Sequence, residues 1–308
     1  MTTQRRWLTP LLIVVTAIVG ALTALQSRVN GSLAEYTGSA LVASMISFGI
    51  GLILLLLFLV RKDTRAGFGR ILRSIRMREL PWWGLLGGAC GAFTILNQAW
   101  AVPYIGVAVF TTAIVVGQLF GASAIDHFGL VGAPKHRFTW LRGVGGALAL
   151  AAVALVGMSG EVSWQTVWLS VLAIAAGFGI ALQLGITGTV KHHAGEAVSP
   201  AVLNFTIGFV LLVVVTGIAA LFGGVEFHGL PTDWWMYLGG PIGVLFILLV
   251  AVVARRLGVF VLSMTIVAGQ LTGSLVLDLL EQRVTWMLLV GVPLAFVGIL
   301  IAHLGARR

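Results

Sequence analysis

Long apolar runs separated by short polar segments make up almost the whole chain. A helix needs about 20 apolar residues to cross the hydrocarbon core of a bilayer, so runs of this length predict membrane-spanning helices. Two long apolar stretches are each divided into two spans. Pro103 divides the first, because proline disfavours a continued helix, and the charged pair Arg255-Arg256 divides the second. We predict ten spans, at 9–29, 39–60, 82–101, 104–125, 143–159, 166–187, 199–222, 235–254, 257–279 and 285–303.

The composition agrees with an all-α polytopic membrane protein and excludes a soluble one. Hydrophobic residues make up 59% of the 308 residues and charged residues only 9%, whereas soluble domains carry about 25% charged residues. The 40 glycines suit close packing of helices in lipid. Cys90 is the only cysteine, which excludes an intramolecular disulfide and a multi-cysteine metal site.

The positive charges indicate the direction in which the chain crosses the membrane. With the N-terminus in the cytoplasm, all but Arg28 and Arg283 of the 19 lysines and arginines fall on the cytoplasmic side. This distribution follows the positive-inside rule and predicts an N-in/C-in topology in the bacterial plasma (inner) membrane. The net charge of +9 is explained by this topology, so we expect the lipid bilayer and no nucleic acid as a partner.

Two basic segments have alternative interpretations. Arg5-Arg6 before the first apolar run resembles a secretory or twin-arginine signal. We interpret the run as the first span, because it contains Gln26, which recurs in the second half. The 61–80 loop has Arg70, Arg73 and Arg76 at helical spacing. It predicts either a helix lying on the anionic inner leaflet or a simple positive anchor for the topology.

A duplicated pattern divides the chain into two halves, 1–160 and 161–308. At an offset of 152 residues the matched pairs are Gly87/Gly239, Gly88/Gly240, Gly91/Gly243, Gly106/Gly258, Gly117/Gly269, Gln118/Gln270, Gly121/Gly273 and Asp126/Asp278. At an offset of 157 they are Gln26/Gln183, Phe48/Phe205 and Gly51/Gly208. Five spans per half is an odd number, so the second half enters the membrane from the opposite face. This predicts two inverted five-helix repeats, the architecture of secondary transporters.

Four motifs support a family resemblance. They are Gln26-Ser-Arg-Val-Asn30-Gly, Ser47-Phe48-Gly-Ile-Gly51, Gly87-Gly88 with Gly91, and Gly117-Gln118 followed by Asp126-His-Phe-Gly129. Together they resemble the YdcZ-like branch of the drug/metabolite transporter superfamily, present here as two fused copies. The second half lacks counterparts of Asn30 and of the His-Phe-Gly sequence. The resemblance implies a ten-helix, inverted-repeat carrier of metabolites or drugs, and it implies no particular substrate.

Side-chain amides inside the membrane are the candidate substrate-binding groups, because a polar group there must be paired or must line a cavity. Gln118 and Gln270 lie at matched positions near mid-depth of two spans that cross in opposite directions. They predict a pair of substrate-binding amides related by the pseudo-twofold axis. The alternative is an interhelical hydrogen bond, worth about 0.6 kcal/mol.

Further candidates are Asn97, Gln98 and Trp100 in the third span, whose partners in the second half are apolar. Polarity confined to one half suggests a wall specific to the solute, although Trp100 is also typical of an interfacial anchor. Gln26 and Gln183 lie toward opposite leaflets, which favours gates at the two ends. Pairing between helices is the alternative for both.

The acidic residues restrict the class of solute. Asp126 and Asp278 end matched helices near opposite faces, where helix capping or solvation is the simplest interpretation and binding of protons or a cation is the alternative. Because the centres of the spans carry no acid, we expect a neutral, zwitterionic or anionic small-molecule solute. Coupling to a proton or to sodium, and formation of a homodimer, are left open.

The leading hypothesis is a secondary transporter working by alternating access, with export favoured over import. The chain contains no HExxH, no GxSxG and no pair of carboxylates at metal-ligand spacing on one helix. We therefore expect no catalytic residues, no metal and no cofactor. The alternative is a helical membrane scaffold, or a subunit of a transport complex, with no pathway of its own.

Overall fold

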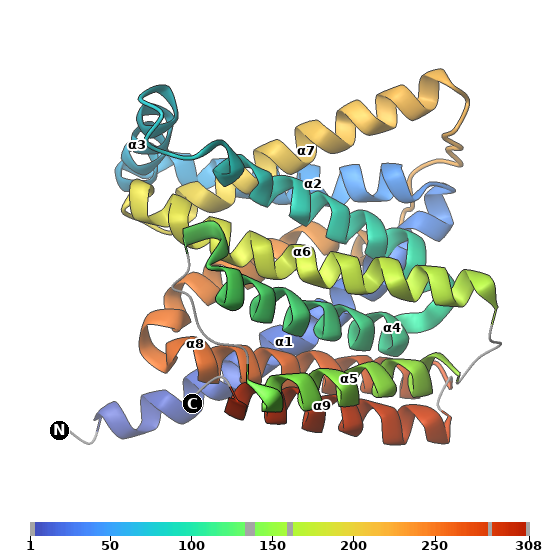
Figure 1. Ribbon diagram of the computed structural model, residues 1–308. Helices are drawn as coiled ribbons and strands as arrows, with labels where there is room; N and C mark the ends of the chain where they lie inside the picture. Colours follow the sequence, from blue (N-terminus) through green and yellow to red (C-terminus); the bar gives the residue numbers. More distant parts are fainter. Residues whose placement is uncertain (1–3, 133–138, 159–162, 283–284, 306–308) are drawn as a thin grey trace.

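The computed structural model describes residues 4–132, 139–158, 163–282 and 285–305, and these residues are almost entirely helical (Figure 1). The helices are α1 (Gln4–Thr37), α2 (Ala40–Leu57), α3 (Lys62–Arg76), α4 (Leu86–Phe128), α5 (Trp140–Gly157), α6 (Trp164–Ala194), α7 (Val198–Leu221), α8 (Gly239–Leu280) and α9 (Trp286–Gly305). Short 3₁₀ turns lie at η1 (Phe58–Val60), η2 (Trp82–Leu85), η3 (Leu130–Gly132) and η4 (Trp234–Tyr237).

Five of these elements are long and apolar enough to cross a membrane: Pro10–Thr37, Ala40–Val60, Trp82–Ile125, Trp164–Ala194 and Val198–Leu221. Shorter apolar helices lie at Gly143–Val156, Gly239–Leu249, Thr265–Leu280 and Trp286–Gly298. Helical structure throughout is the expected outcome, because apolar runs in lipid must satisfy their backbone groups internally. The all-helical class predicted from the sequence is confirmed for the described residues.

Helix α4 is broken in the middle. At 43 residues it would be roughly 65 Å long if straight, about twice the thickness of the hydrocarbon core. Gly106 interrupts it with φ 76° and ψ 168°, a conformation that a side chain makes costly. The sequence placed this break at Pro103, and that position was wrong by one turn. Pro103 remains inside the helix, and the glycine makes the break.

Both ends of α4 lie against the same stretch of α6. A Cβ atom placed on Gly87, at the start of α4, would lie 3.2 Å from the side chain of Ile186. Just beyond the end of α4, the carbonyl of Val131 accepts a hydrogen bond of 3.0 Å from the Thr189 hydroxyl. The chain therefore turns back on itself at the break.

The same arrangement recurs for α8 against α1. Gly239, at the start of α8, lies beside the Asn30 side chain. Glu281, directly after its end, forms an ion pair with Arg28. Both ends of this 42-residue helix thus meet one turn of α1, and the ribbon folds back between them (Figure 1). The side chains of the expected Arg255-Arg256 junction lie outside the part of the chain that the structure describes.

Contacts between the two halves repeat at the offsets found in the sequence. Gly117 of α4 packs on the backbone carbonyl of Ile174 in α6, and Gly269 of α8 packs on that of Ala17 in α1. Gly88 and Gly240 approach the carbonyls of Asn204 and Ser47 in the same way. Each half therefore packs these glycines of its third and fourth predicted spans against the second and first helices of the other half, respectively, so the halves are interlocked.

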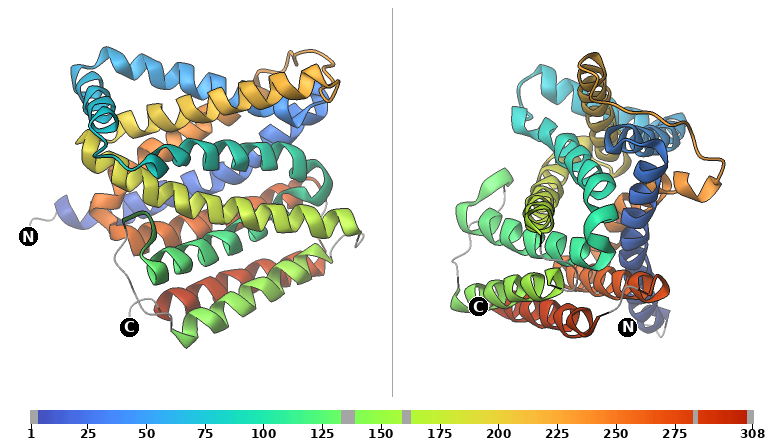
Figure 2. Two further views of the ribbon diagram at one scale, coloured as in Figure 1. Left: turned by 45° about the horizontal axis from the view of Figure 1, so that its top comes forward. Right: turned by 90° about the vertical axis from the view of Figure 1, so that its right-hand side faces the viewer.

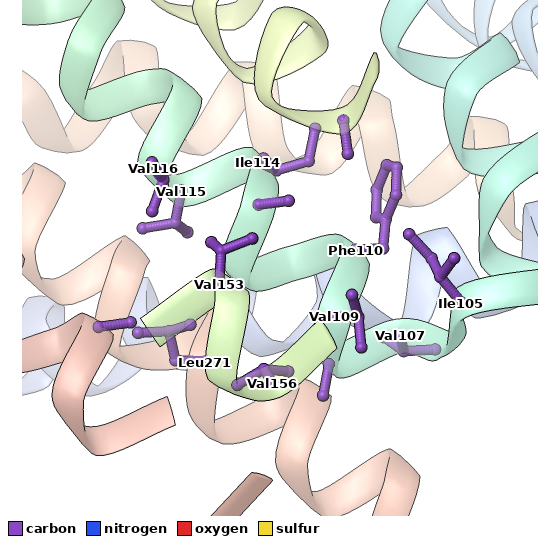
Figure 3. Packing of buried hydrophobic residues seen from close by; sticks show 14 of the residues in the cluster. Ile105, Val107, Val109, Phe110, Ile114, Val115, Val116, Val153, Val156 and Leu271 are labelled. Atoms are coloured by element: carbon purple, nitrogen blue, oxygen red, sulfur yellow. The ribbon is translucent and has the colours of Figure 1, made fainter. Parts of the chain in front are cut away.

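The main apolar core follows the second part of α4. Ile105, Val109, Phe110 and Val116 are buried here and pack with residues of α5, α6, α8 and α9 (Figure 3). Helices α5 and α9 lie side by side at one edge of the bundle in all three views (Figures 1 and 2). This core packs around the second segment of α4. The region between α1, α4, α6 and α8 contains the cavity that is described below.

Charged groups lie at the two ends of the bundle. Both termini and the basic helix α3 lie at one end, and the connection between α7 and α8 lies at the other (Figures 1 and 2). Helix α3 packs on α6 and α7, with Ile71 fully buried and most of its cations exposed. At the opposite end Arg28 pairs with Glu35 and Glu281. Arg283 lies outside the described residues.

Candidate functional site

A cavity of about 410 Å³ lies between the two halves of the chain. Its walls come mainly from α1, α4, α6 and α8, with contributions from α2 and α7. This volume lies within the range of roughly 300–1,000 Å³ that is usual for sites of small molecules. The cavity is therefore large enough to hold a small solute inside the helical bundle.

Five of the seven residues predicted from the sequence line this one cavity: Gln26, Gln98, Gln118, Gln183 and Gln270. The sequence could not show this grouping, since the residues come from four helices. Asn97 and Trp100 are not among the lining residues. Asn97 is 2% exposed and Trp100 is 45% exposed, so the first is packed within the bundle and the second lies at its surface.

Many lining positions occur as pairs related by the repeat. Gln26 and Gln183, Gln118 and Gln270, and Phe48 and Phe205 are such pairs. Phe48 and Phe205 also touch each other, with ring centroids 5.0 Å apart. The cavity therefore lies where the two halves meet, and its centre is almost symmetric.

Gln26 and Gln270, two of the amides in the cavity wall, differ in their hydrogen bonds. The Nε2 of Gln26 donates a bond of 2.9 Å to the carbonyl of Gly239, which holds Gln26 at the start of α8. Gln270 is 6% exposed, and its Oε1 has no hydrogen-bond partner among the described residues. An acceptor buried in this way is costly unless a ligand or water supplies a donor.

Gln98 closes one end of the cavity. The Nδ2 of Asn30 donates a buried hydrogen bond of 2.7 Å to the Oε1 of Gln98. Next to this bond, a Cβ atom placed on Gly31 would lie 3.1 Å from the Val102 side chain and 3.4 Å from Pro103. Asn30 is itself fully buried. Helices α1 and α4 are thus in close contact here and leave no passage.

The other end of the cavity is less tightly packed. At the offset of 157, Thr187, Gly188 and Lys191 correspond to Asn30, Gly31 and Ala34. These three residues of α6 line the cavity, whereas their counterparts on α1 do not. A Cβ atom on Gly188 would meet nothing within 4 Å. The same structural position is therefore packed against a helix in one half and lines the cavity in the other.

Two lining residues that the sequence did not single out are Asn204 and Thr187. The Nδ2 of Asn204 donates a hydrogen bond of 2.9 Å to the Thr187 hydroxyl. At the offset of 157, Asn204 corresponds to Ser47 and Thr187 to Asn30. Each half therefore has one asparagine at this pair of positions, on its first helix in the first half and on its second helix in the second half. Aligning the two halves position by position, and not motif by motif, would have revealed this exchange.

Asp278 lies outside the cavity lining and has a structural role. It is 3% exposed, and its Oδ2 accepts a hydrogen bond of 3.0 Å from the backbone N–H of Ala108. Ala108 follows the break at Gly106, so Asp278 caps the second segment of α4. The side chain of Asp126 lies outside the described residues.

A helical bundle of apolar segments around an amide-lined cavity is typical of a membrane transporter. The comparison with known proteins identifies the family. The family described as "Putative inner membrane exporter, YdcZ" matches residues 11–155 and, a second time, residues 168–301. The chain belongs to this family and contains two copies of its unit, which confirms the resemblance seen in the motifs.

A curated relative leads to the same family. The chain is 26% identical over 132 residues to the Inner membrane protein YdcZ of Escherichia coli K12. This match covers 43% of the present chain and 81% of that protein, so one half of this chain is about one YdcZ unit. The protein is a multi-pass protein of the bacterial inner membrane and belongs to the transporters.

Proposed function

We propose that the protein is a secondary carrier that exports a small neutral, zwitterionic or anionic solute by alternating access. In this proposal ten spans form two inverted five-helix repeats, with both termini in the cytoplasm. The cavity between the repeats is the solute site, and the present conformation is open to the cytoplasm.

The observation that carries the proposal is the difference between the two ends of the cavity. Asn30 and Gly31 are packed against α4, while the matching Thr187 and Gly188 line open space. In an inverted repeat, exchanging the conformations of the two halves would close the second end and open the first. Such an exchange is alternating access.

The placement of charges supports export as the direction of transport. The open end contains Lys191 and lies at the end of α6, next to α3 and its exposed arginines. Arg28 at the closed end is neutralised by two glutamates. By the positive-inside rule the open end is cytoplasmic, which gives a solute access from the side where an exporter collects it.

A scaffold or accessory subunit is the alternative function. It would not need a cavity at the junction of the halves, nor a buried amide oxygen without a partner such as Oε1 of Gln270. Six amide side chains lining one cavity favour a protein that binds its own solute.

The test is a thermal-shift screen of the purified protein against metabolites, amino acids and antibiotics. Compounds that raise the melting temperature are then tested on Gln118→Leu and Gln270→Leu, which remove the central amides at similar volume. We expect both variants to fold and to lose the stabilisation. Trp100→Leu is the matched control, since Trp100 lies outside the cavity, and it should keep the response. An unchanged response in both glutamine variants would reject the central-amide site.

A further inference from the structure

We infer that the cavity binds an uncharged solute through a primary carboxamide or lactam joined to an aromatic body, and that Gln270 recognises this polar group. A carboxamide or lactam carries an N–H donor next to a carbonyl acceptor. This inference rests on the proposed carrier function and narrows its solute class from neutral, zwitterionic or anionic to neutral.

Gln270 is a buried residue of the cavity wall whose amide forms no bond within the protein. It lies on α8, lines the cavity and is 6% exposed. Its Oε1 has no hydrogen-bond partner among the described residues, and its Nε2 donates to none of them. Leaving both groups unpaired costs free energy. A solute that supplies a donor and an acceptor would remove this cost.

The amide of Gln270 can present either of its atoms to the cavity. A rotation of 180° about χ3 exchanges the oxygen and the nitrogen, and this torsion has a broad, roughly twofold profile. A glutamine amide forms two parallel hydrogen bonds with an edge that carries a donor beside an acceptor, as it does with adenine in DNA. A carboxamide or lactam offers such an edge without carrying a charge.

The other amides of the wall are less suited to this role. Three of them already have a partner: Gln26 bonds to Gly239, Gln98 to Asn30, and Asn204 to Thr187. Gln118 and Gln183 form no hydrogen bond with the described residues, but both are only half-buried. Gln270 is the most buried of the three unbonded glutamines. Its bonds to a solute would be the best protected from water, which strengthens them.

The wall provides little to balance an ionic group bound at Gln270. Among the described residues that line the cavity, none is acidic, and the one basic residue, Lys191, lies in the last turn of α6. A carboxylate or an ammonium at Gln270 would lose its hydration without gaining an opposite charge. An uncharged polar group loses much less hydration, and the amide replaces it.

The rest of the wall indicates the body of the solute. Four phenylalanines line the cavity: Phe48, Phe110, Phe205 and Phe246. The rings of Phe48 and Phe205 lie 5.0 Å apart, centroid to centroid, with an interplanar angle of 36°. Aromatic pairs attract one another beyond the effect of burial alone. A solute with an aromatic ring therefore gains more in this cavity than an aliphatic one of equal size.

The test measures the affinity of the full-length purified protein for two isosteric sets of probes by isothermal titration. One set is 3-phenylpropionamide, 4-phenyl-2-butanone, 3-phenylpropionate and 3-phenylpropylamine. The other is indole-3-acetamide, indole-3-acetone, indole-3-acetate and tryptamine. Each ketone replaces the amide NH₂ by a methyl group and so lacks the donor. We expect each carboxamide to bind about tenfold more tightly than its ketone. The carboxylates and amines should bind more weakly than the ketones.

Three variants assign the preference to its residue. Gln270→Leu and Gln270→Met remove the amide, and the second keeps an unbranched side chain. Each should reduce the ratio between carboxamide and ketone to about one and leave the affinity for the ketone unchanged. Ser274→Ala removes a buried hydroxyl of the same helix that does not line the cavity, and it should retain the tenfold ratio. A tenfold ratio that persists in both Gln270 variants would overturn the assignment.

Other outcomes separate this inference from the carrier function. If carboxamide and ketone bind equally to the wild type, and Gln118→Leu weakens the binding of both, the recognition of a carboxamide is wrong and the solute site remains. If Gln118→Leu changes neither affinity, both proposals fail. Tightest binding of the carboxylates or the amines, or no binding of any probe, overturns the inference of an uncharged solute.

Discussion

At the scale of single residues, the two halves differ most in where they place one amide. The first half has Asn30 and Ser47, and the second has Thr187 and Asn204 at the matching positions. Asn30 of α1 bonds to Gln98 of α4 at one end of the cavity, whereas Asn204 bonds to Thr187 within its own half. The counterpart of Gln98 is Val250, which cannot accept a hydrogen bond. In the proposed carrier, a side-chain bond of the Asn30–Gln98 type would stabilise closure of one end only and so favour the inward-open conformation.

This asymmetry leads to a prediction. Gln98→Ala removes the bond to Asn30 and should raise the outward-open population about threefold, since a hydrogen bond between membrane helices is worth ~0.6 kcal/mol. The readout is the rate at which a membrane-impermeant maleimide labels Ala34→Cys from outside, in a Cys90→Ala background. Ala34 is 7% exposed in the closed end. Trp100→Ala, on the same helix, is the control. Equal rates in the Gln98 variant and its parent would show that the bond does not hold the gate.

At the scale of helices, glycine makes the break in α4 and allows the close helix crossings. The repeated glycine pairs in the sequence predicted close contacts, and the structure shows what they touch. Gly117 of α4 and Gly177 of α6 each lie against the backbone of the other helix. A side chain at either place would separate the helices, because no flexible group there can move aside.

The corresponding prediction compares two glycines of α6. Gly177→Ala introduces a methyl group against the backbone carbonyl of Ile114 and should lower the melting temperature by roughly 5 °C. Gly188→Ala, on the same helix, faces open space and should leave it unchanged. Thermal unfolding of both purified variants in one detergent measures the difference. A similar melting temperature for the two would mean that the α4–α6 crossing is looser than the structure indicates.

The elements also show where sequence reasoning was limited. Apolar runs were sufficient to predict the helices, because the bilayer requires a length that the sequence displays directly. The break in α4 was assigned to Pro103, since proline is the usual signal, but a proline is tolerated in a helix when its neighbours accommodate it. Gly106 was visible as a repeated glycine. The hydrogen bond from the Ala108 N–H to Asp278, just after the break, joins residues 170 positions apart, so no local pattern reveals it.

At the scale of the whole molecule, the halves exchange contacts. The repeat could be predicted from matched residues, and the five glutamines could be singled out, because polar groups in apolar runs are conspicuous, although their grouping around one cavity could not be predicted. The pairing of α4 with α6 and of α8 with α1 could not, since a sequence does not state which half a helix packs on. For the same reason Lys191 was interpreted as a topology signal alone. Its place in the cavity wall follows from three-dimensional packing.

Side-specific labelling of two matched positions tests the central claim, an inverted carrier open to the cytoplasm, most directly. In a Cys90→Ala background, Asn30→Cys and Thr187→Cys are exposed to an impermeant maleimide in right-side-out and inside-out vesicles. Thr187→Cys should react rapidly and only from the cytoplasmic face. Asn30→Cys should react slowly and only from the outer face. Reaction of both cysteines from the same face would contradict the inverted arrangement and the mechanism built on it.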